Sequence, residues 1–203
     1  MKLYYSPTSP FVRKCLVAAH ELGIRDRIEL VPSNAHPVTR DRALVARNPL
    51  GQVPTLVTDE GAVLYDSRVV VEYLNALAAG ELVPEDAEAR WSALTEQSLA
   101  DGMTDAALLT RYEVAVRPDA LRWSEWIEGQ LDKVACGLAD LERRASSFGD
   151  RVDVGTIAFA CSLGYLDFRF ASLAWRERHP NAAAWYAWFA GRESMVETRP
   201  PAA

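Results

Sequence analysis

Long apolar runs are scarce in this chain of 203 residues. The longest, Ala182 to Ala190, has nine residues, whereas a membrane-spanning helix needs about 20. Serine and proline interrupt the N-terminal segment, so it does not resemble an export signal. We therefore expect no membrane partner.

Cysteine and histidine are also scarce, with three of each. Cys15, Cys136 and Cys161 are far apart and form no CxxC pair, which suits a reducing cytoplasm better than an exported disulfide framework. The histidines form no pair at metal-ligand spacing, and the chain has neither a glycine-rich phosphate loop nor a GxSxG motif. The expectation is a cytoplasmic protein without a metal.

The charge is acidic overall and unevenly distributed. The net charge is −6 and no block of basic residues occurs, which argues against a nucleic-acid partner. Residues 1–80 carry nine basic and eight acidic side chains, whereas residues 81–203 carry thirteen and twenty. This shift in composition is the first indication of two units.

The N-terminal part alternates between strand-like and helix-like segments. Helical spacing relates Val12, Cys15 and Ala19, and Cys15 is expected to be an inert core residue on that helix. Ser67 is expected to cap a second helix. Strands are expected at Lys2–Tyr5, Ile28–Val31, Thr55–Thr58 and Ala62–Tyr65, the last two forming a hairpin.

The rest of the chain shows helical patterns and no convincing strand. Helices are expected from about 86 to 112, after Pro118 to about 144, over 154–168 behind an Asp153 cap, and from Pro180 as the last one. The fold class is therefore α/β followed by an all-α domain. We place the domains at 1–79 and 87–203, with a linker at 80–86.

Three short segments could carry chemistry. Ser9 precedes Pro10 at the start of a helix, where unpaired N–H groups and the helix dipole favour an anion such as a thiolate. The segment Asn48–Leu56 contains Val53-Pro54 just before a strand, and Tyr65–Arg68 joins a strand to a helix. Taken alone, each is better explained as a helix cap or an ordinary trans-proline turn.

Together, these segments resemble the glutathione transferase superfamily. The resemblance rests on Tyr4–Lys14, Asn48–Leu56 and Asp66-Ser67 in that order, and it extends to Gly164–Phe170 in the helical half. It implies a thioredoxin-like N-terminal domain, an all-α C-terminal domain and a homodimer. The expected interface consists of the helix after Ser67 and the helix spanning Trp91–Leu109.

The resemblance also implies a glutathione site. Pro54 would be cis, and the backbone of Val53 would pair with the cysteinyl part of glutathione. Asp66 and Ser67 would hold its γ-glutamyl end, with the acid on the ammonium and the hydroxyl on the carboxylate.

The glycyl carboxylate of glutathione would lie near the irregular segment 36–52. Arg40 and Gln52 are the candidates to bind it. His36 is a weaker option that we expect to be exposed and idle.

The hydroxyl that donates to the glutathione thiolate would be Ser9, in a setting similar to the serine-type tau class and to the omega class, where cysteine replaces serine. Other serine classes place this hydroxyl one residue earlier, so Thr8 is a competitor. Serine in place of cysteine favours conjugation over mixed-disulfide reduction. A second substrate would be walled by Phe11 and by the helix that contains Met103, Arg111 and Tyr112.

The implied activity is a glutathione transferase acting on a small hydrophobic electrophile in detoxification, with glutathione as co-substrate and no metal. The alternatives are a glutathione-dependent isomerase, dehalogenase or peroxidase, or a non-catalytic dimeric binding module. One departure from the family concerns Asp153-Val154-Gly155-Thr156. Thr156 is expected to be a poor reciprocal partner for the Asp153 cap, at a cost of about 1 kcal/mol.

Overall fold

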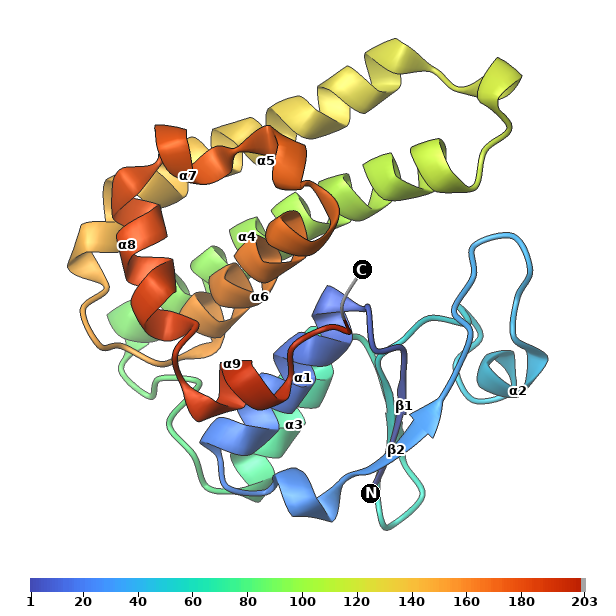
Figure 1. Ribbon diagram of the computed structural model, residues 1–203. Coiled ribbons are helices and arrows are strands. Elements are labelled where there is room, and N and C mark those ends of the chain that lie inside the picture. The colour runs from blue at the N-terminus through green and yellow to red at the C-terminus, as the bar shows by residue number, and fades with distance from the viewer. Residues whose placement is uncertain (202–203) are drawn as a thin grey trace. The chain divides into compact units, whose positions relative to one another are not determined.

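The computed structural model describes residues 1–201, which form two compact units (Figure 1). Unit 1 contains Met1–Arg90 together with the described residues from Glu193 onward, and unit 2 contains Trp91–Arg192. The domain boundaries expected from the sequence stay a prediction. The observed units differ from them most at the C-terminus, where the last segment of the chain returns to unit 1.

Unit 1 contains a four-stranded mixed sheet with the order β2-β1-β3-β4. β1 is parallel to β2 and antiparallel to β3, and β3 is antiparallel to β4. The expected hairpin between the last two strands is present. The strands are β1 (Lys2–Tyr5), β2 (Glu29–Pro32), β3 (Thr55–Val57) and β4 (Val63–Leu64).

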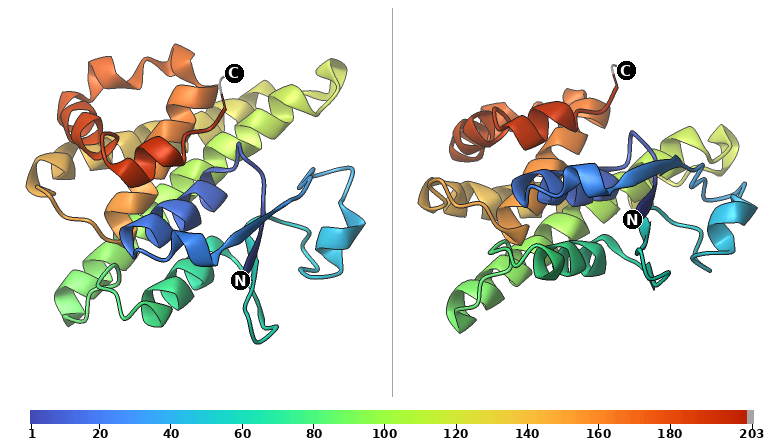
Figure 2. Two further views of the ribbon diagram at one scale, coloured as in Figure 1. Left: turned by 60° about the horizontal axis from the view of Figure 1, so that its bottom comes forward. Right: turned by 90° about the horizontal axis from the view of Figure 1, so that it is seen from below.

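Two helices, α1 (Pro10–Glu21) and α3 (Ser67–Leu77), lie side by side in unit 1 (Figures 1 and 2). Their buried apolar faces complete the core of the unit around Leu3 and Leu56, both fully buried. The short 3-10 helix η1 (Arg25–Arg27) leads into β2. A further short helix, α2 (Arg42–Val45), lies in a stretch that the sequence pattern left irregular, and the Asp41 side chain caps it.

The C-terminal helix α9 (Glu193–Glu197) packs against α1 on the side away from α3 (Figure 2). Arg13 fastens this contact, because its Nη2 donates to the Met195 carbonyl at 2.9 Å and its Nε to the Thr198 hydroxyl at 3.4 Å. The sequence pattern predicted that the last helix begins at Pro180. That prediction is wrong, because α9 follows the helix that begins there. Five residues were too short a segment to reveal periodicity.

Unit 2 is built from helices. Its elements are α4 (Ala87–Ala115, in this unit from Trp91), η2 (Asp119–Leu121), α5 (Ser124–Arg144), η3 (Ala145–Ser147), α6 (Val154–Arg169), η4 (Ala171–Leu173), α7 (Trp175–Arg178) and α8 (Pro180–Phe189). Every residue of α6 from Val154 to Leu166 is buried, which makes it the core helix. Within the described residues, no helix alone is long and apolar enough to cross a membrane; α6 passes that test only jointly with 171–178, across a 98° bend.

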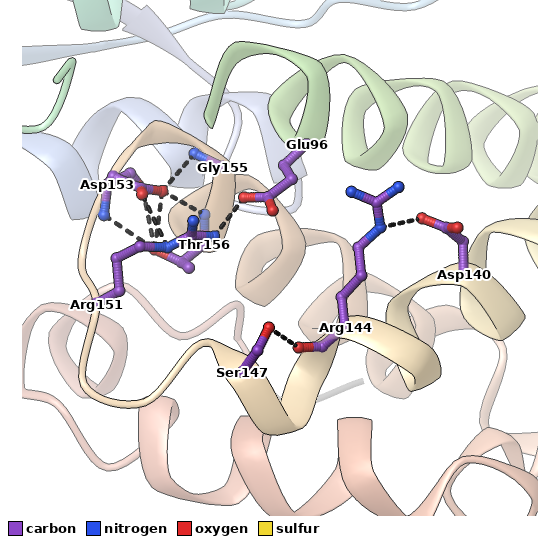
Figure 3. A network of polar contacts seen from close by, with 8 residues as sticks. All are labelled: Glu96, Asp140, Arg144, Ser147, Arg151, Asp153, Gly155 and Thr156. Carbon is purple, nitrogen blue, oxygen red and sulfur yellow. Dashed lines mark hydrogen bonds and ion pairs between the residues drawn. The ribbon is translucent and has the colours of Figure 1, made fainter. Parts of the chain in front are cut away.

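A buried polar network fixes the start of α6 (Figure 3). The Asp153 carboxylate accepts from the backbone N–H groups of Gly155 and Thr156, both at 2.9 Å. The Thr156 hydroxyl in turn accepts from the Asp153 N–H at 2.9 Å, which completes a capping box. The expectation that Thr156 is a poor reciprocal partner is therefore wrong: its short side chain reaches because Asp153 is extended, with φ −146° and ψ −178°.

Arg151 joins this cap to α4. Its Nε lies 3.0 Å from Asp153 Oδ2, and its Nη2 bonds to Glu96 Oε2. Burial raises the pKa of Glu96, and the charge of Arg151 opposes that rise. The guanidinium also lies over the Phe148 ring, 4.8 Å from its centroid. The network thus connects α4, the 148–153 segment and α6 within unit 2.

Candidate functional site: three loops at one end of the sheet

The strand register brings three loops of unit 1 to the same end of the sheet. β1 and β3 pair Tyr4 with Thr55, so the end of β1 lies beside the start of β3. β3 and β4 pair Leu56 with Leu64, so the end of β4 lies beside the same point. Residues 6–9, 48–54 and 65–67 therefore meet there, and we call this place the three-loop edge.

Ser9 caps α1 at the three-loop edge. Its backbone is extended, with φ −80° and ψ 120°, and its Oγ accepts a hydrogen bond from the Val12 N–H at 3.3 Å. Because the oxygen is used as an acceptor, the hydroxyl proton remains able to donate to a ligand. The adjacent N–H groups of the first helical turn add a positive end of the helix dipole.

Thr8 lies in the turn before the helix and does not cap it. Its Oγ1 is 3.4 Å from the Ser6 Oγ, and either hydroxyl can be the donor. Thr8 and Ser9 are both half-buried. One feature distinguishes the two hydroxyls: Ser9 caps the N-terminus of α1, and Thr8 does not.

The second loop carries a cis peptide bond between Val53 and Pro54, as the family resemblance implied. Val53 is half-buried and Pro54 is buried. The buried side chain of Asn48 organises this loop. Its Nδ2 donates to the Thr55 hydroxyl at 3.0 Å and to the Gln52 carbonyl at 3.3 Å.

Asn48 also closes the turn on its other side. Its Oδ1 accepts from the Leu50 N–H at 3.0 Å, and its carbonyl accepts from the Gly51 N–H at 2.7 Å. The side chain is 1% exposed, so these bonds are shielded from water. Asn48 is a residue that sequence reasoning missed: the Asn-Pro-Leu-Gly pattern indicated a turn but not a buried amide at its centre.

The third loop leads from β4 into α3. Asp66 is exposed and caps α3, its Oδ1 accepting from the Arg68 N–H at 2.9 Å. The prediction that Ser67 would be the cap is wrong, because the extended Asp66 presents its carboxylate to the first turn one residue earlier. Ser67 is instead the first helical residue and is 2% exposed.

The second turn of α1 contacts the first residue of α3 near this edge. The Cys15 thiol of α1 lies 3.8 Å from the Ser67 carbonyl oxygen, the distance of a weak hydrogen bond. Cys15 itself is fully buried, as predicted for a core residue. A helix N-terminus with polar side chains favours an anionic group, and this edge holds two of them.

The candidates for a glycyl carboxylate lie around the second loop. Arg40 and Gln52 are both exposed. The Arg40 Nη2 donates to the Pro49 carbonyl at 2.6 Å, and its guanidinium lies against Gly51. Arg40 therefore supports the loop that holds Gln52, and its remaining N–H groups can face a ligand.

His36 is not idle, contrary to the expectation. It is half-buried, and its Nδ1 accepts from the N–H groups of Val38 and Thr39 at 3.2 and 3.0 Å. The ring thereby holds the turn in which Ala35 pairs with Arg40. Its short sequence spacing to these donors gave no periodic signal.

The two residues expected to wall a second substrate lie in different units. Phe11 is half-buried in the first turn of α1, with the Lys14 ammonium 5.8 Å from its ring centroid. Tyr112 is half-buried near the end of α4, and burial raises its pKa. Among the described residues, no group of three or more His, Cys, Asp or Glu side chains is arranged to hold a metal ion.

Models of two glutathione S-transferase domains match this chain, the N-terminal domain at residues 8–77 and the C-terminal domain at 124–187. An uncharacterised GST-like protein of Escherichia coli, YibF, is 36% identical over the whole length of both chains. The chain belongs to the glutathione S-transferase family. Its mixed sheet followed by a helical unit is the fold of that family.

A glutathione transferase family member of Pseudomonas fluorescens Pf-5 has been solved with two ligands. With bound glutathione it has a TM-score of 0.96 to this chain, 46% identity and 98% coverage of both chains. With bound S-(propanoic acid)-glutathione it has a TM-score of 0.91 and 45% identity, covering 99% of this chain and 100% of that one. More distant similarity extends to a longer protein. Elongation factor 1-gamma of Danio rerio is 24% identical over 91% of this chain, which spans 42% of that protein.

Proposed function

We propose that this chain is a glutathione transferase that binds glutathione at the three-loop edge and activates its thiol. The observation that carries the proposal is the meeting of Ser9, Val53-Pro54 and Asp66 at one end of the sheet. Each offers a different group: a hydroxyl at a helix N-terminus, a backbone segment and an exposed carboxylate. The glutathione bound in the related Pseudomonas protein supports this assignment.

The roles follow from the chemistry of the tripeptide. The exposed Asp66 carboxylate would pair with the γ-glutamyl ammonium, while the Ser67 end of α3 would receive the neighbouring carboxylate. The Val53 backbone would pair with the cysteinyl residue. Arg40 and Gln52 would bind the glycyl carboxylate from the other side of the loop.

Activation means stabilising the thiolate over the thiol. A free thiol has a pKa of about 8.5, so only a few per cent is ionised at neutral pH. Lowering that pKa by about two units requires about 2.7 kcal/mol of differential stabilisation. A hydrogen bond from the Ser9 hydroxyl and the N-terminus of α1 together supply energies of this order.

The thiolate would then attack a carbon of a small electrophile. In substitution, the sulfur–carbon bond forms as the leaving group departs with its electron pair. In addition to an activated double bond, the π electrons move to the neighbouring carbon, which takes a proton from water. The S-(propanoic acid)-glutathione bound by the related protein carries an acid substituent on sulfur, which supports conjugation over reversible use of glutathione as a cofactor.

Calorimetric titration with reduced glutathione, followed by product analysis with a set of electrophiles, tests the proposal. Saturable binding with one glutathione consumed per product is the expected result. Turnover that leaves glutathione unchanged would replace it with the isomerase alternative, and oxidised glutathione would indicate peroxide reduction. Absence of binding would favour the non-catalytic binding module.

We also propose that the chain forms a homodimer. Large apolar side chains stay exposed on the two helices that the resemblance assigns to the interface: Val69 on α3 is 46% exposed, and Trp91 and Leu109 on α4 are 67% and 43% exposed. Apolar groups of this size favour burial against a partner. Sedimentation equilibrium at micromolar concentration should give twice the chain mass, and the mass of a single chain would contradict the proposal.

A further inference from the structure

The C-terminal segment of unit 1 is fastened to α1 by polar contacts that the preceding function does not use (Figure 2). Arg13 donates to the Met195 carbonyl at 2.9 Å and to the Thr198 hydroxyl at 3.4 Å. The Thr198 hydroxyl donates in turn to the Ser194 carbonyl at 2.7 Å, so its proton is used there and its oxygen is left as an acceptor for Arg13. We call Arg13, Met195 and Thr198 the α9 clasp.

The α9 clasp is shielded from water. Arg13 is 9% exposed, Met195 is fully buried and Thr198 is half-buried. Both acceptors of Arg13 are neutral oxygen atoms, and among residues 1–201 its guanidinium forms no ion pair with a carboxylate. Burying a positive charge against neutral acceptors costs desolvation free energy that an apolar side chain would avoid. Stability alone therefore does not account for an arginine at this position.

Arg13 lies one helical turn after Ser9 on α1. Its backbone N–H donates to the Ser9 carbonyl at 3.0 Å, and the Val12 N–H donates to the Ser9 hydroxyl oxygen at 3.3 Å. Side chains of a helix lean toward its N-terminus, so the Arg13 side chain covers the turn that begins at Ser9. The α9 clasp thus holds the turn that carries the proposed donor to the glutathione sulfur.

The two sides of α1 are held by different kinds of contact. Toward α3 the helix buries apolar side chains, and apolar packing is non-directional, so it tolerates small shifts of the helix. Hydrogen bonds are directional and weaken when donor and acceptor move apart by about 0.5 Å. A hydroxyl that donates to a thiolate needs the same precision, because a displacement of about 1 Å can remove most of a catalytic interaction. Of the two sides, the one facing α9 is suited to supply that precision.

We propose that Arg13 is a positioning residue: through the α9 clasp it holds the first turn of α1 so that the Ser9 hydroxyl meets the glutathione sulfur. The inference rests on the proposed function, because it concerns the activation of the same thiol. Arg13 touches no reacting atom and acts only through the position of Ser9. A contact that spans 182 residues of sequence thereby makes the C-terminal segment a part of thiol activation.

The experiment measures the pKa of the thiol of bound glutathione from the ultraviolet absorbance of the thiolate across pH. Arg13→Gln removes both bonds of the guanidinium and should raise this pKa by about one unit above that of the unmodified chain. About tenfold less thiolate then forms at any pH below both values. Near pH 5.5, where the bound thiol is mostly protonated in both proteins, the affinity for reduced glutathione should differ by less than about twofold, which also shows that the variant is folded.

Two further variants separate the position of α1 from the charge of Arg13. Arg13→Lys keeps the positive charge, but a single ammonium cannot replace the planar fork that reaches two acceptors. Thr198→Val keeps Arg13 and removes one of those acceptors. Each should raise the bound thiol pKa by about half a unit. If both variants keep the pKa of the unmodified chain, the inference is overturned, because the lost charge would then explain any rise in Arg13→Gln.

Ser194→Ala is the matched control. Ser194 lies in α9, is 4% exposed, and donates its hydroxyl to Glu21 in the last turn of α1. Like Thr198→Val, it removes one hydroxyl of the C-terminal segment, but at the end of α1 that is far from Ser9. Thermal unfolding should show comparable losses of stability in these two variants, and only Thr198→Val should raise the thiol pKa. An equal rise in both would overturn the inference, because general loosening of the segment would explain it.

The same titrations distinguish failure of the inference from failure of the proposed function. A thiol pKa near the free value of about 8.5 in the unmodified chain with bound glutathione would remove the proposed activation, and the inference with it. A low thiol pKa in the unmodified chain and in every variant would remove the inference alone.

Discussion

The helix caps of the two units are built from the same local pattern and have different surroundings. In unit 1, Ser9 and Asp66 each accept one backbone N–H, and each keeps further hydrogen-bonding capacity at a surface. In unit 2, Asp153 is 3% exposed and is fully engaged by Gly155, Thr156 and Arg151. A cap that is saturated inside the chain holds the fold, whereas a cap with unused capacity at a surface can bind a ligand.

The largest effect is expected from Asp153→Ala. It removes two hydrogen bonds at the start of α6 and leaves Arg151 without one of its two carboxylates. We expect a loss of about 3 kcal/mol in the free energy of unfolding, measured by urea denaturation. The glutathione affinity of the folded fraction should be unchanged. A loss below about 0.5 kcal/mol would show that the Asp153 cap contributes little to stability. It would contradict the distinction between this cap and the caps of unit 1.

A smaller effect is expected from Gly51→Ala, which tests how firmly the second loop is held. Gly51 has φ +62°, and an added Cβ would lie 2.9 Å from Val45 Cγ2 and 3.0 Å from Arg40 Nη2. Strain and displacement of Arg40 should together cost about 2 kcal/mol and weaken glutathione binding. Gly61→Ala is the control, since φ is +86° there and nothing lies within 4 Å. It should cost about 1 kcal/mol and leave binding intact.

Asp66→Asn separates the charge of the exposed cap from its capping bond. Asparagine caps helices about as well as aspartate, so unfolding should change by less than about 0.5 kcal/mol. Loss of the charge should weaken glutathione binding about tenfold, because the ammonium loses its ionic partner. Calorimetry measures the affinity and thermal unfolding the stability. A variant that binds as well as the original chain would remove Asp66 from the proposed site.

The smallest effect concerns pH. Burial raises the pKa of Glu96 in the saturated network, so its contribution to stability is present below about pH 4.5 and is lost as pH rises through its folded pKa. The hydrogen bond from Arg117 lowers the pKa of Glu113. The contribution of Glu113 to stability is therefore present above about pH 4.5 and is lost as pH falls through its folded pKa. The stability difference between the original chain and Glu96→Gln should therefore fall from pH 4 to 7. For Glu113→Gln it should rise, and equal slopes in thermal unfolding would contradict this assignment.

Much of the fold could be predicted because its signals are local. The hairpin at 55–64, the helix behind Asp153 and the order of elements in unit 1 follow from periodicity and turn residues. The sequence did not predict the short helices α2 and α9, because four or five residues do not establish a helical period. The docking of α9 on α1 through Arg13 depends on a contact 182 residues apart, which no local pattern encodes.

The site was predictable in part. The family resemblance predicted the site residues Ser9, Val53, Pro54, Asp66 and Ser67. The strand register brings the loops that contain them together. The buried amide of Asn48 and the turn held by His36 depend on side-chain hydrogen bonds to specific backbone atoms, which sequence spacing does not show. The roles of Val53, Asp66 and Ser67 in glutathione binding, and the choice of Ser9 over Thr8, stay predictions.

The most direct test is the pKa of the glutathione thiol when it is bound, measured by the ultraviolet absorbance of the thiolate across pH. In the original chain we expect it about two units below the free value of about 8.5, because the Ser9 hydroxyl donates to the sulfur at the N-terminus of α1. Ser9→Ala should return it most of the way, and Thr8→Ala should leave it low. An unchanged thiol pKa in Ser9→Ala would contradict the claim that this unsaturated cap activates glutathione.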